Sequence, residues 1–556
     1  MDEQIGQLDR GDAAHWNRLT LPHLFERNDL QLSKTAIVFE DRTRTYGELR
    51  DAGRRVANAL IGLGVEEFDR VAVLSSNRLE FIEIETGIAA ARAIMVPLNW
   101  RLRPNELANL LRRSAAKAIL VEDRFLGTVL ELRRSGEVPD LRSVISLDGG
   151  AADLSYDEIF SSSSPERPTR SRRMDDPHEI IFTSGTTGQP KGVVWTDGTV
   201  IWNSLQQLID FRLGPEHSTY AIIDLYYIGG RHAFTWAMLH QGGTVHVKRS
   251  SGFDAEEVLS YVERHGVTHV LWVPTMLYDI LRLPNLAEHD TSRLQMIMCG
   301  GQPVSIATTV RAREAFPETD FVQVYGLTEG GAAVTFIRPD DARAHPGSAG
   351  RPASHVELKL VDAHGAEVPA GTNGEILIRA PSLTAGYWDD PQTTSRQIVD
   401  GWLHTGDMGH VDADGFLYIV GRKGDMIISG GMNVFPSEIE SVLLEHPAVA
   451  DVAVIGLPDD RWGEIVCAVI EPFPGAVVDE ADIIAFCTAR IAGYKKPSAV
   501  RVVDSLPRTA AGKPRKFVLR ERFAGLRGDT GPADYRIGQL ESDGAKSSIT
   551  RESSRP

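Results

Sequence analysis

One stretch of the sequence combines glycines, hydroxyl side chains and a lysine as a phosphate-binding loop requires. It is IIFTSGTTGQPKGVVW, residues 180–195. Glycine lets backbone N–H groups turn toward an anion, hydroxyls donate further hydrogen bonds, and lysine adds a positive charge. A Walker A loop is excluded, because it needs Gly-Lys-Ser/Thr after a fixed spacer and Pro190 precedes this lysine. An ordinary surface loop is the alternative, but the ordered string favours a polyphosphate site made by Thr183, Ser184, Gly185, Thr186, Thr187, Gly188 and Lys191.

A second stretch, AIIDLYYIGGRHAFTW at residues 221–236, places an acid inside an apolar run. The run begins like a buried strand, and a buried carboxylate without a partner is costly. Two interpretations of Asp224 remain open. It caps a turn through its own backbone, as Asp often does after a strand; or it pairs with a cationic or hydrogen-bonding part of a substrate, or with Arg231.

The helices and strands that must position these residues alternate along the sequence. TYGELRDAGRRVANALIGLG has helical spacing, whereas DRVAVLSS is a short β-branched run. The helix pattern DAEEVLSYVERHG precedes the strand pattern VTHVLWVP, and LQMIMCGG, SIATTVRAREAFP and FVQVYG continue the alternation. This predicts an α/β fold, with a large N-terminal domain of βαβ-built sheets covered by helices.

The composition changes near residue 420, where GFLYIVGRKGDMIISGG is rich in glycine. A smaller α+β pattern follows and extends to about residue 525. We therefore predict a large domain over residues 1–423 and a small mobile domain over 424–525, joined by a hinge. Residues 526–556 are polar with few large apolar side chains, which predicts a disordered tail.

Composition and charge exclude several classes of protein. The chain has 556 residues and a net charge of −17, which argues against a nucleic-acid partner but leaves a small anionic substrate open. Its three cysteines form no CxxC pair. The N-terminus lacks the features of a signal peptide, and no apolar run has the length of a membrane span. We expect a cytoplasmic protein without a membrane span.

Further motifs follow the glycine-rich loop in a fixed order: CGGQP, YGLTEG, HTGDMG, GRKGDMIISGGMNVFPSEIE and LPRTAAGKPRK. Together they resemble the signatures of the adenylate-forming superfamily, which includes acyl-CoA synthetases, peptide-synthetase adenylation domains and firefly luciferase. The resemblance covers about residues 16–523. It is greatest to free-standing AMP-forming acyl-CoA ligases, which the segments MVPLNWRL, VPTML, GLPDDRWGE, GYKKP and SGGMNVFPSEIE resemble, and no carrier-protein attachment motif of the form Gly-Gly-His-Ser is present.

The resemblance implies a role for each matching residue. Tyr325 would stack on adenine, which an aromatic face suits. Thr328 would contact a phosphate, and Glu329 would hold Mg²⁺, which prefers oxygen ligands. Asp407 would accept the ribose hydroxyls. The remaining adenine and ribose residues would be Gly300, Gly301, Gln302 and Arg422.

The resemblance also implies a two-step reaction. A fatty or aryl acid would attack the α-phosphate of ATP to give acyl-AMP and pyrophosphate, with Lys513 of the small domain stabilising the developing charge. The small domain would then rotate about Gly424, and coenzyme A would displace AMP. Gly430 and Gly431 would lie along the coenzyme A path. A homodimer is compatible with the resemblance, since dimers are common among such ligases.

The chain departs from the family pattern at the second stretch. The family commonly has Pro-Leu-Phe/Tyr-His-x-x-Gly there, whereas this chain has Asp224 for the proline and Tyr227 for the histidine. The implied substrate pocket contains Asp224, Tyr227 and Gly229, so the change falls at the substrate. Alternative functions are acyl transfer to a carrier protein, ATP-dependent nitrite activation with diazotisation of an aryl amine, and nucleotide binding without catalysis.

Overall fold

The computed structural model describes residues 19–27, 30–183, 190–250, 252–302, 304–508 and 514–524. The chain divides into two compact units, residues 1–424 and 425–556, and each is described by itself. Several predicted site residues lie outside the described ranges, namely Ser184, Gly185, Thr186, Thr187, Gly188 and Lys513, as does the predicted tail.

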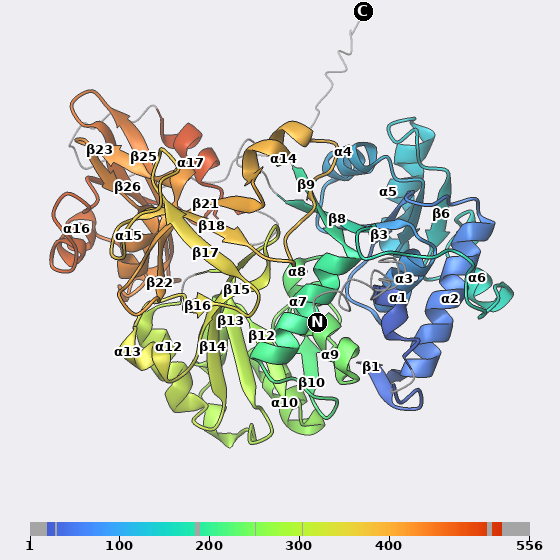
Figure 1. Ribbon diagram of the computed structural model, residues 1–556. Helices are drawn as coiled ribbons and strands as arrows, with labels where there is room; N and C mark the ends of the chain where they lie inside the picture. The colour runs from blue at the N-terminus through green and yellow to red at the C-terminus, as the bar shows by residue number, and fades with distance from the viewer. Residues whose placement is uncertain are drawn as a thin grey trace, which may run out of the picture. The chain divides into compact units, whose positions relative to one another are not determined.

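The larger unit contains two extended, mainly parallel sheets, which confirms the predicted α/β class (Figure 1). The first runs in the order β19 (Gly386–Tyr387), β9 (Lys191–Thr196), β8 (Pro177–Thr183), β4 (Ile94–Leu98), β3 (Arg70–Leu74), β5 (Ala118–Val121), β6 (Ser143–Ser146) and β7 (Leu154–Ser155). The second runs in the order β16 (Arg351–Pro352), β15 (Gly331–Ile337), β14 (Asp320–Leu327), β13 (Met296–Gly300), β12 (His269–Trp272), β10 (Ser218–Ala221), β11 (Thr244–Val247), β1 (Thr35–Phe39) and β2 (Arg42–Thr45).

A smaller antiparallel sheet follows in the chain, with the order β17 (Glu357–Val361), β18 (Gly374–Arg379), β21 (Trp402–Val411) and β20 (Ile398–Val399), and with β22 (Leu417–Arg422) also paired to β21. The helices of this unit are α1 (Leu21–Leu24), α2 (Tyr46–Gly62), α3 (Leu79–Ala90), α4 (Pro104–Ser114), α5 (Asp123–Arg134), α6 (Tyr156–Ser162), α7 (Asp197–Asp210), α8 (Ile228–His232), α9 (Thr235–Gln241), α10 (Ala255–His265), α11 (Pro274–Ile280), α12 (Ile306–Ala315), α13 (Asp341–Ala344) and α14 (Pro391–Gln397), with a 3₁₀ turn at Leu286–Glu288.

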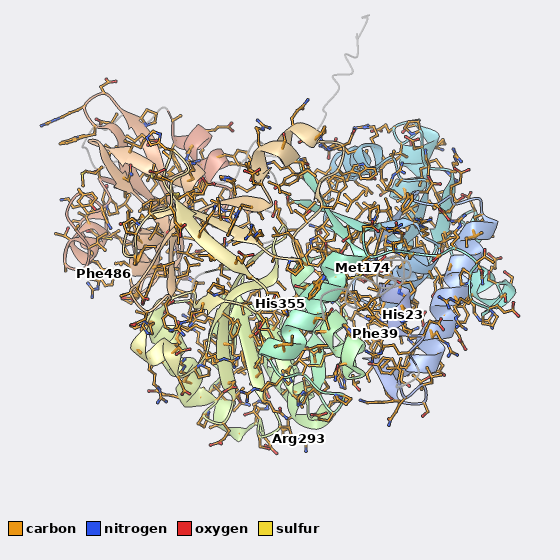
Figure 2. The ribbon with its side chains drawn as sticks, viewed as in Figure 1. His23, Phe39, Met174, Arg293, His355 and Phe486 are labelled. Atoms are coloured by element: carbon orange, nitrogen blue, oxygen red, sulfur yellow. The ribbon has the colours of Figure 1, made fainter. Side chains whose placement is uncertain are left out.

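Helices form a layer between the two large sheets. Helix α3 contacts β4 of the first sheet and β1 of the second, and it packs alongside α2 (Figure 1). Phe39, labelled in Figure 2, ends β1 and is fully buried in this layer's core. Helices α4 and α5 cover the other face of the first sheet, and α10 to α12 pack against the second. No helix among the described residues is long and apolar enough to cross a membrane.

Local sequence signals explain several boundaries. Helix α2 begins with a capping box, in which Thr45 accepts from the Glu48 backbone N–H and the Glu48 carboxylate accepts from the Thr45 N–H. The strand expected through residue 223 ends earlier: β10 stops at Ala221, and Asp224 lies in the turn beyond it. Phe234 and Trp236 of the second stretch belong to the core, because both are fully buried, as are Ala237 and Met238 of α9.

Helix α3 is buried around its whole circumference, so each of its acids needs a partner. Glu80 receives hydrogen bonds from Arg42 and Arg78. Glu83 receives hydrogen bonds from Arg44 and from the Tyr156 hydroxyl, at 2.7 Å each. The third acid, Glu85, faces the interior of the helical layer and belongs to a larger network.

This network is organised by the guanidinium of Arg231, which is fully buried on α8. Its Nη1 donates to Glu85 Oε1 at 2.7 Å, its Nη2 donates to Glu179 of β8, and its Nε donates to the backbone oxygen of Leu225. Burial is the largest single influence on Glu85 and opposes its ionisation, but Arg231 and His178 together outweigh burial and lower the pKa of this carboxyl. Arg231 thus ties a helix, a strand and the turn before α8 to one another.

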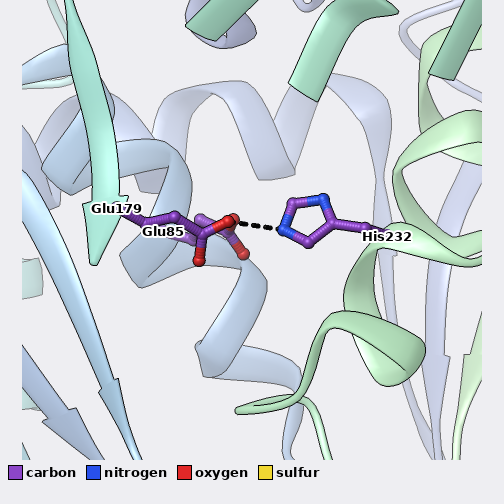
Figure 3. A group of neighbouring side chains, drawn as sticks. All are labelled: Glu85, Glu179 and His232. Carbon is purple, nitrogen blue, oxygen red and sulfur yellow. Dashed lines mark hydrogen bonds and ion pairs between the residues drawn. The ribbon is translucent and has the colours of Figure 1, made fainter. Parts of the chain in front are cut away.

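Glu85, Glu179 and His232 converge in the same space, as Figure 3 shows. His232 Nε2 lies 2.6 Å from Glu179 Oε1, and the Trp195 ring lies 4.4 Å from the imidazole, centroid to centroid. Burial lowers the pKa of His232. Two carboxylates and an imidazole could hold a metal ion, but Arg231 already supplies a cation to both carboxylates. We therefore interpret the cluster as a structural ion network.

The smaller unit has the α+β character expected from the sequence. Its sheet has the order β24 (Met432–Val434), β23 (Ile427–Ser429), β26 (Gly463–Pro472) and β25 (Val449–Asp459), with β27 (Ala499–Val502) also paired to β26. Helices α15 (Pro436–Leu443) and α16 (Glu480–Thr488) pack on one core of this sheet, and α17 (Lys516–Phe523) packs on the other.

Replacing Arg231 should destabilise the larger unit strongly. Arg231→Met leaves two buried carboxylates without their cation, which should lower the free energy of unfolding by about 3–5 kcal/mol. The matched control is Arg379→Met, which removes an exposed pair with Glu357 and should change stability by about 0–1 kcal/mol. Urea unfolding followed by tryptophan fluorescence measures both. Equal effects of the two substitutions would contradict the assigned role of Arg231.

Candidate active site

Three of the predicted nucleotide residues meet in the structure, although they come from separate strands. The Tyr325 hydroxyl on β14 donates to Asp407 Oδ2 at 2.7 Å, and Arg422 Nε donates to Asp407 Oδ1 at 3.2 Å. Strands β21 and β22 pair so that Asp407 lies opposite Arg422. Burial, and then the Asp407 charge, raise the pKa of Tyr325 well above its usual value, so this hydroxyl stays protonated. The cluster offers an aromatic ring, a carboxylate and a guanidinium together.

The predicted adenine-lining turn begins where β13 ends. A Cβ added at Gly300 would lie 2.5 Å from Val324 Cγ2 and 2.7 Å from the Val324 backbone oxygen, so β14 passes too close for any side chain. Gly301 has a φ of +87°, which glycine adopts without strain. Gly300 is thus buried against the strand that carries Tyr325, and Gly301 and Gln302 after it are exposed.

Thr328 and Glu329 are held by β9 and by the segment that leads into β19. The Trp195 indole on β9 donates to the Thr328 backbone oxygen at 2.7 Å, and the Thr384 N–H donates to the Glu329 backbone oxygen at 2.9 Å. The Glu329 carboxylate accepts a 2.9 Å hydrogen bond from the Tyr387 hydroxyl. A carboxylate has about four acceptor positions, so this bond leaves room for a cation.

Tyr387 is a site residue that sequence analysis missed. Its hydroxyl reaches Glu329, and Lys191 Nζ lies 5.4 Å from the centroid of its ring. It is brought there by the antiparallel pairing of β19 with β9, which joins segments far apart in the chain. No local motif around residue 387 signals this pairing. Thr183 and Lys191 lie opposite each other at the ends of β8 and β9, where the glycine-rich segment leaves and re-enters the sheet.

The partner of Asp224 is Arg101, and the predicted pairing with Arg231 is wrong. Arg231 is occupied by Glu85 and Glu179 in the interior. Arg101 Nη1 donates to Asp224 Oδ2, while Trp100 Nε1 and the Ser250 hydroxyl donate to Oδ1 at 3.3 and 2.6 Å. The turn expected at Asp224 exists, but it is closed by the backbone, since Tyr227 N–H donates to the Asp224 oxygen at 3.0 Å.

Asn77 holds the same turn from its other side. Its side-chain amide donates to the Ile223 oxygen at 3.1 Å and accepts from the Leu225 N–H at 2.7 Å. Asn77 and the 100–101 segment follow β3 and β4 of one large sheet, whereas residues 223–225 and Ser250 follow β10 and β11 of the other. The Asp224 turn therefore joins the carboxyl ends of strands from both sheets, where open α/β sheets commonly bind ligands.

The rest of the turn is tight. A Cβ added at Gly230 would lie 2.3 Å from the Asp224 backbone oxygen, so glycine is required there. Gly229 and Gly230 help to line a small open pocket of only about 10 Å³, together with residues 219–223, Ala233 and Leu271. Tyr226 is buried, whereas Tyr227 is half-buried, and their ring centroids lie 4.3 Å apart.

The predicted hinge and coenzyme A residues lie at and after the division between the units. Gly424 is within a 3₁₀ turn, Lys423–Asp425, and a Cβ added there would meet nothing within 4 Å. Gly430 and Gly431 have φ values of +57° and +79°. A Cβ at Gly430 would lie 2.8 Å from Cε3 of Trp462, whose ring is exposed.

Comparisons with known proteins identify the family. The model of the AMP-binding enzyme family matches residues 24–388, and that of the AMP-binding enzyme C-terminal domain matches residues 438–513. The indoleacetate–CoA ligase of Aromatoleum aromaticum is 36% identical over 501 residues, covering 89% of this chain and 96% of that ligase. A fatty acid–[acyl-carrier-protein] ligase of Streptomyces coeruleorubidus is 34% identical, covering 88% and 93%.

A solved structure extends the likeness to three dimensions. The anthranilate CoA ligase in complex with anthranoyl-AMP superposes with a TM-score of 0.83 at 30% identity, covering 90% of this chain and 97% of the other. The ordered motifs of the sequence resemble those of the adenylate-forming enzymes. The family matches, the similar relatives and the α/β fold agree with that resemblance. The chain therefore belongs to the AMP-binding enzyme family, the adenylate-forming enzymes.

Proposed function

We propose that the protein is an AMP-forming carboxylate–CoA ligase. The observation that carries the proposal is the pair of clusters at the nucleotide residues: Tyr325 with Asp407 and Arg422, and Glu329 with Tyr387 beside Lys191. Tyr325 lies 82 residues from Asp407, and Glu329 lies 58 residues from Tyr387, so the fold brings these groups together. Similar relatives named as CoA ligases or synthases support the proposal, among them the indoleacetate–CoA ligase, a feruloyl-CoA synthase of Amycolatopsis and a 2-succinylbenzoate–CoA ligase of Listeria monocytogenes.

In the first step, a carboxylate oxygen of the acid forms a bond to the α-phosphorus of ATP, and the bond from that phosphorus to the pyrophosphate oxygen breaks. Glu329 would hold Mg²⁺, which neutralises phosphate charge when it is bound. Thr183, Lys191 and Thr328, with Ser184, Gly185, Thr186, Thr187 and Gly188, would bind the phosphates. Lys513 would stabilise charge between the carboxylate and the α-phosphate.

In the second step, the coenzyme A thiolate attacks the acyl carbon and AMP leaves with the electron pair of the acyl–oxygen bond. Gly424 would act as the hinge, since it lies at the division between the units and carries no side chain to restrict φ and ψ. Gly430 and Gly431 would lie along the coenzyme A path. The closeness of the exposed Trp462 ring to Gly430 supports this, because a pantetheine arm needs an apolar surface that no Cβ obstructs.

We further propose an aryl or acyl acid as the substrate, without a required ammonium group. Asp224 was a candidate partner for a cationic substrate, but its carboxylate already accepts from Arg101, Trp100 and Ser250. It is therefore satisfied before any substrate enters. The names of similar relatives, indoleacetate–CoA ligase and feruloyl-CoA synthase, support an aryl acid.

The acceptor can be tested by product analysis. Purified protein, MgATP and a panel of aryl and fatty acids should release pyrophosphate, and added coenzyme A should give acyl-CoA detectable by mass spectrometry. A carrier protein in place of coenzyme A, as for one similar relative, and nitrite with an aryl amine are the comparison reactions. Turnover that needs nitrite or a carrier protein, and proceeds without coenzyme A, would overturn the proposal.

The proposed role of Lys513 in the first step can be tested separately from the second step. Lys513→Ala should lower acid-dependent pyrophosphate release roughly 10²–10³-fold, the usual effect of removing one transition-state donor. Conversion of supplied acyl-AMP and coenzyme A to acyl-CoA should remain within about tenfold of wild type. Lys496→Ala, also in the smaller unit, is the control for loss of a positive charge. A normal adenylation rate in the Lys513 variant would refute its role.

Tyr387 should act on nucleotide binding. Tyr387→Phe removes the hydrogen bond to Glu329 and should raise the KM for MgATP several-fold, while leaving the KM for the acid unchanged. The matched control is Tyr156→Phe, which also removes a hydroxyl-to-glutamate bond but at Glu83, away from the site. That control should change stability alone. A Tyr387→Phe enzyme with wild-type KM for MgATP would show that Tyr387 is only structural.

A further inference from the structure

The turn between β14 and β15, residues 328–332, carries Thr328 and Glu329 and is held at both of its ends by buried side chains. At its start, Nε1 of the Trp195 indole donates to the Thr328 backbone oxygen at 2.7 Å. At its end, Oδ1 of Asn203 on α7 accepts from the Ala332 N–H at 3.1 Å. Trp195 and Asn203 are both buried, so their own packing fixes the positions of these two bonds.

His232 supports both of these side chains. Its imidazole lies against the Trp195 ring, and its Nε2 lies 2.6 Å from Glu179 Oε1 (Figure 3). Its backbone oxygen accepts from Asn203 Nδ2 at 2.8 Å. Glu179 lies directly opposite Trp195 in the pairing of β8 with β9. The two ends of the 328–332 turn therefore rest on one fully buried residue, which is itself bonded to β8.

These contacts join the 328–332 turn to the two strands that flank the glycine-rich segment. Glu179 belongs to β8, which ends at Thr183, and Trp195 belongs to β9, which begins at Lys191. The strand that carries Lys191 thus also carries the indole that bonds to Thr328. Trp195 therefore fixes where the start of the turn lies relative to the ends of the glycine-rich segment.

We propose that Trp195 and Asn203 are positioning residues for the first step of the reaction. They hold the 328–332 turn, with Thr328 and Glu329 on it, in place relative to the two ends of the glycine-rich segment. The inference rests on the proposed function, in which Thr328 contacts a phosphate and Glu329 holds Mg²⁺. In the second step, acyl-AMP has already lost pyrophosphate and the charge that Mg²⁺ would neutralise, so that step should depend less on the turn.

The first experiment measures backbone hydrogen exchange in the free protein by mass spectrometry. Trp195→Phe keeps an aromatic ring beside His232 and removes the indole N–H. Exchange in residues 328–333 should become about three- to tenfold faster, the effect of losing one hydrogen bond. The matched control is Trp236→Phe, which removes a 3.0 Å indole bond to Glu85 on α3 instead. It should leave exchange in the turn unchanged, and equal acceleration in the two variants would overturn the proposal.

The second experiment separates the two steps of the reaction. Trp195→Phe should lower acid-dependent pyrophosphate release about three- to tenfold and raise the Mg²⁺ concentration that gives half the maximal rate. The KM for the acid, and the conversion of supplied acyl-AMP and coenzyme A to acyl-CoA, should stay within about twofold of wild type. Loss of folded protein would lower both steps in the same proportion. Equal losses in the two steps would therefore refute a positioning role.

Asn203→Leu tests the other end of the turn. Leucine keeps the shape of the side chain but leaves the Ala332 N–H without its acceptor, so exchange in the turn should rise and pyrophosphate release should slow, as for Trp195→Phe. The matched control is Gln207→Met, because Gln207 Nε2 donates to the same His232 oxygen, at 2.7 Å, without bonding to Ala332. That control should leave both measurements at the wild-type value.

The outcomes distinguish this inference from the proposed function. If wild type releases no pyrophosphate with any acid, the proposed function fails and the inference fails with it. If wild type is active but the Trp195 and Asn203 variants keep normal exchange in the turn and normal MgATP kinetics, the inference alone is contradicted.

Discussion

The guanidinium of Arg231 is the group on which the geometry of the larger unit depends. It lies in the helical layer between two sheets and neutralises one glutamate from α3 and one from β8. Strand β8 leads directly to the glycine-rich segment, and α8 follows directly from the Asp224 turn. One buried cation thus fixes the strand before the proposed phosphate-binding segment relative to the turn that is proposed to lie at the acid.

A second level of constraint acts at the edges of the sheets. The Asp224 turn is held by Asn77, Trp100, Arg101 and Ser250, which follow strands of both sheets. Asp224, the acid that interrupts an apolar run, therefore connects segments that follow strands of the two large sheets. This explains how the sequence of the Asp224 turn can differ from the family pattern while the ordered motifs are retained. Asp224, which stands in place of the family proline, has its own partners in Trp100, Arg101 and Ser250.

The fold class and part of the candidate site could be predicted from the sequence, because they depend on local patterns or on motifs in a fixed order. The alternation of strand and helix patterns predicted the α/β fold. The motifs predicted Tyr325, Asp407 and Arg422, and the fold brings these three together.

The partners of Asp224 and Glu329 could not be predicted in the same way. Arg101 lies 123 residues from Asp224, and Tyr387 lies 58 residues from Glu329. Both contacts depend on which strand ends become neighbours in the fold. The spacing of residues in the sequence does not predict these neighbours. Arg231 misled for a related reason: it is close to Asp224 in the chain, but α8 turns its side chain into the interior, where two acids compensate the cost of burying it.

The central claim is that the acid is activated by transfer to the α-phosphate of ATP. It is tested most directly with an acid labelled with ¹⁸O in both carboxylate positions. Formation of acyl-AMP and its later cleavage by a thiol should leave one labelled oxygen in AMP, found by mass spectrometry of the product nucleotide. Unlabelled AMP, or label in inorganic phosphate with ADP as the product nucleotide, would contradict the account.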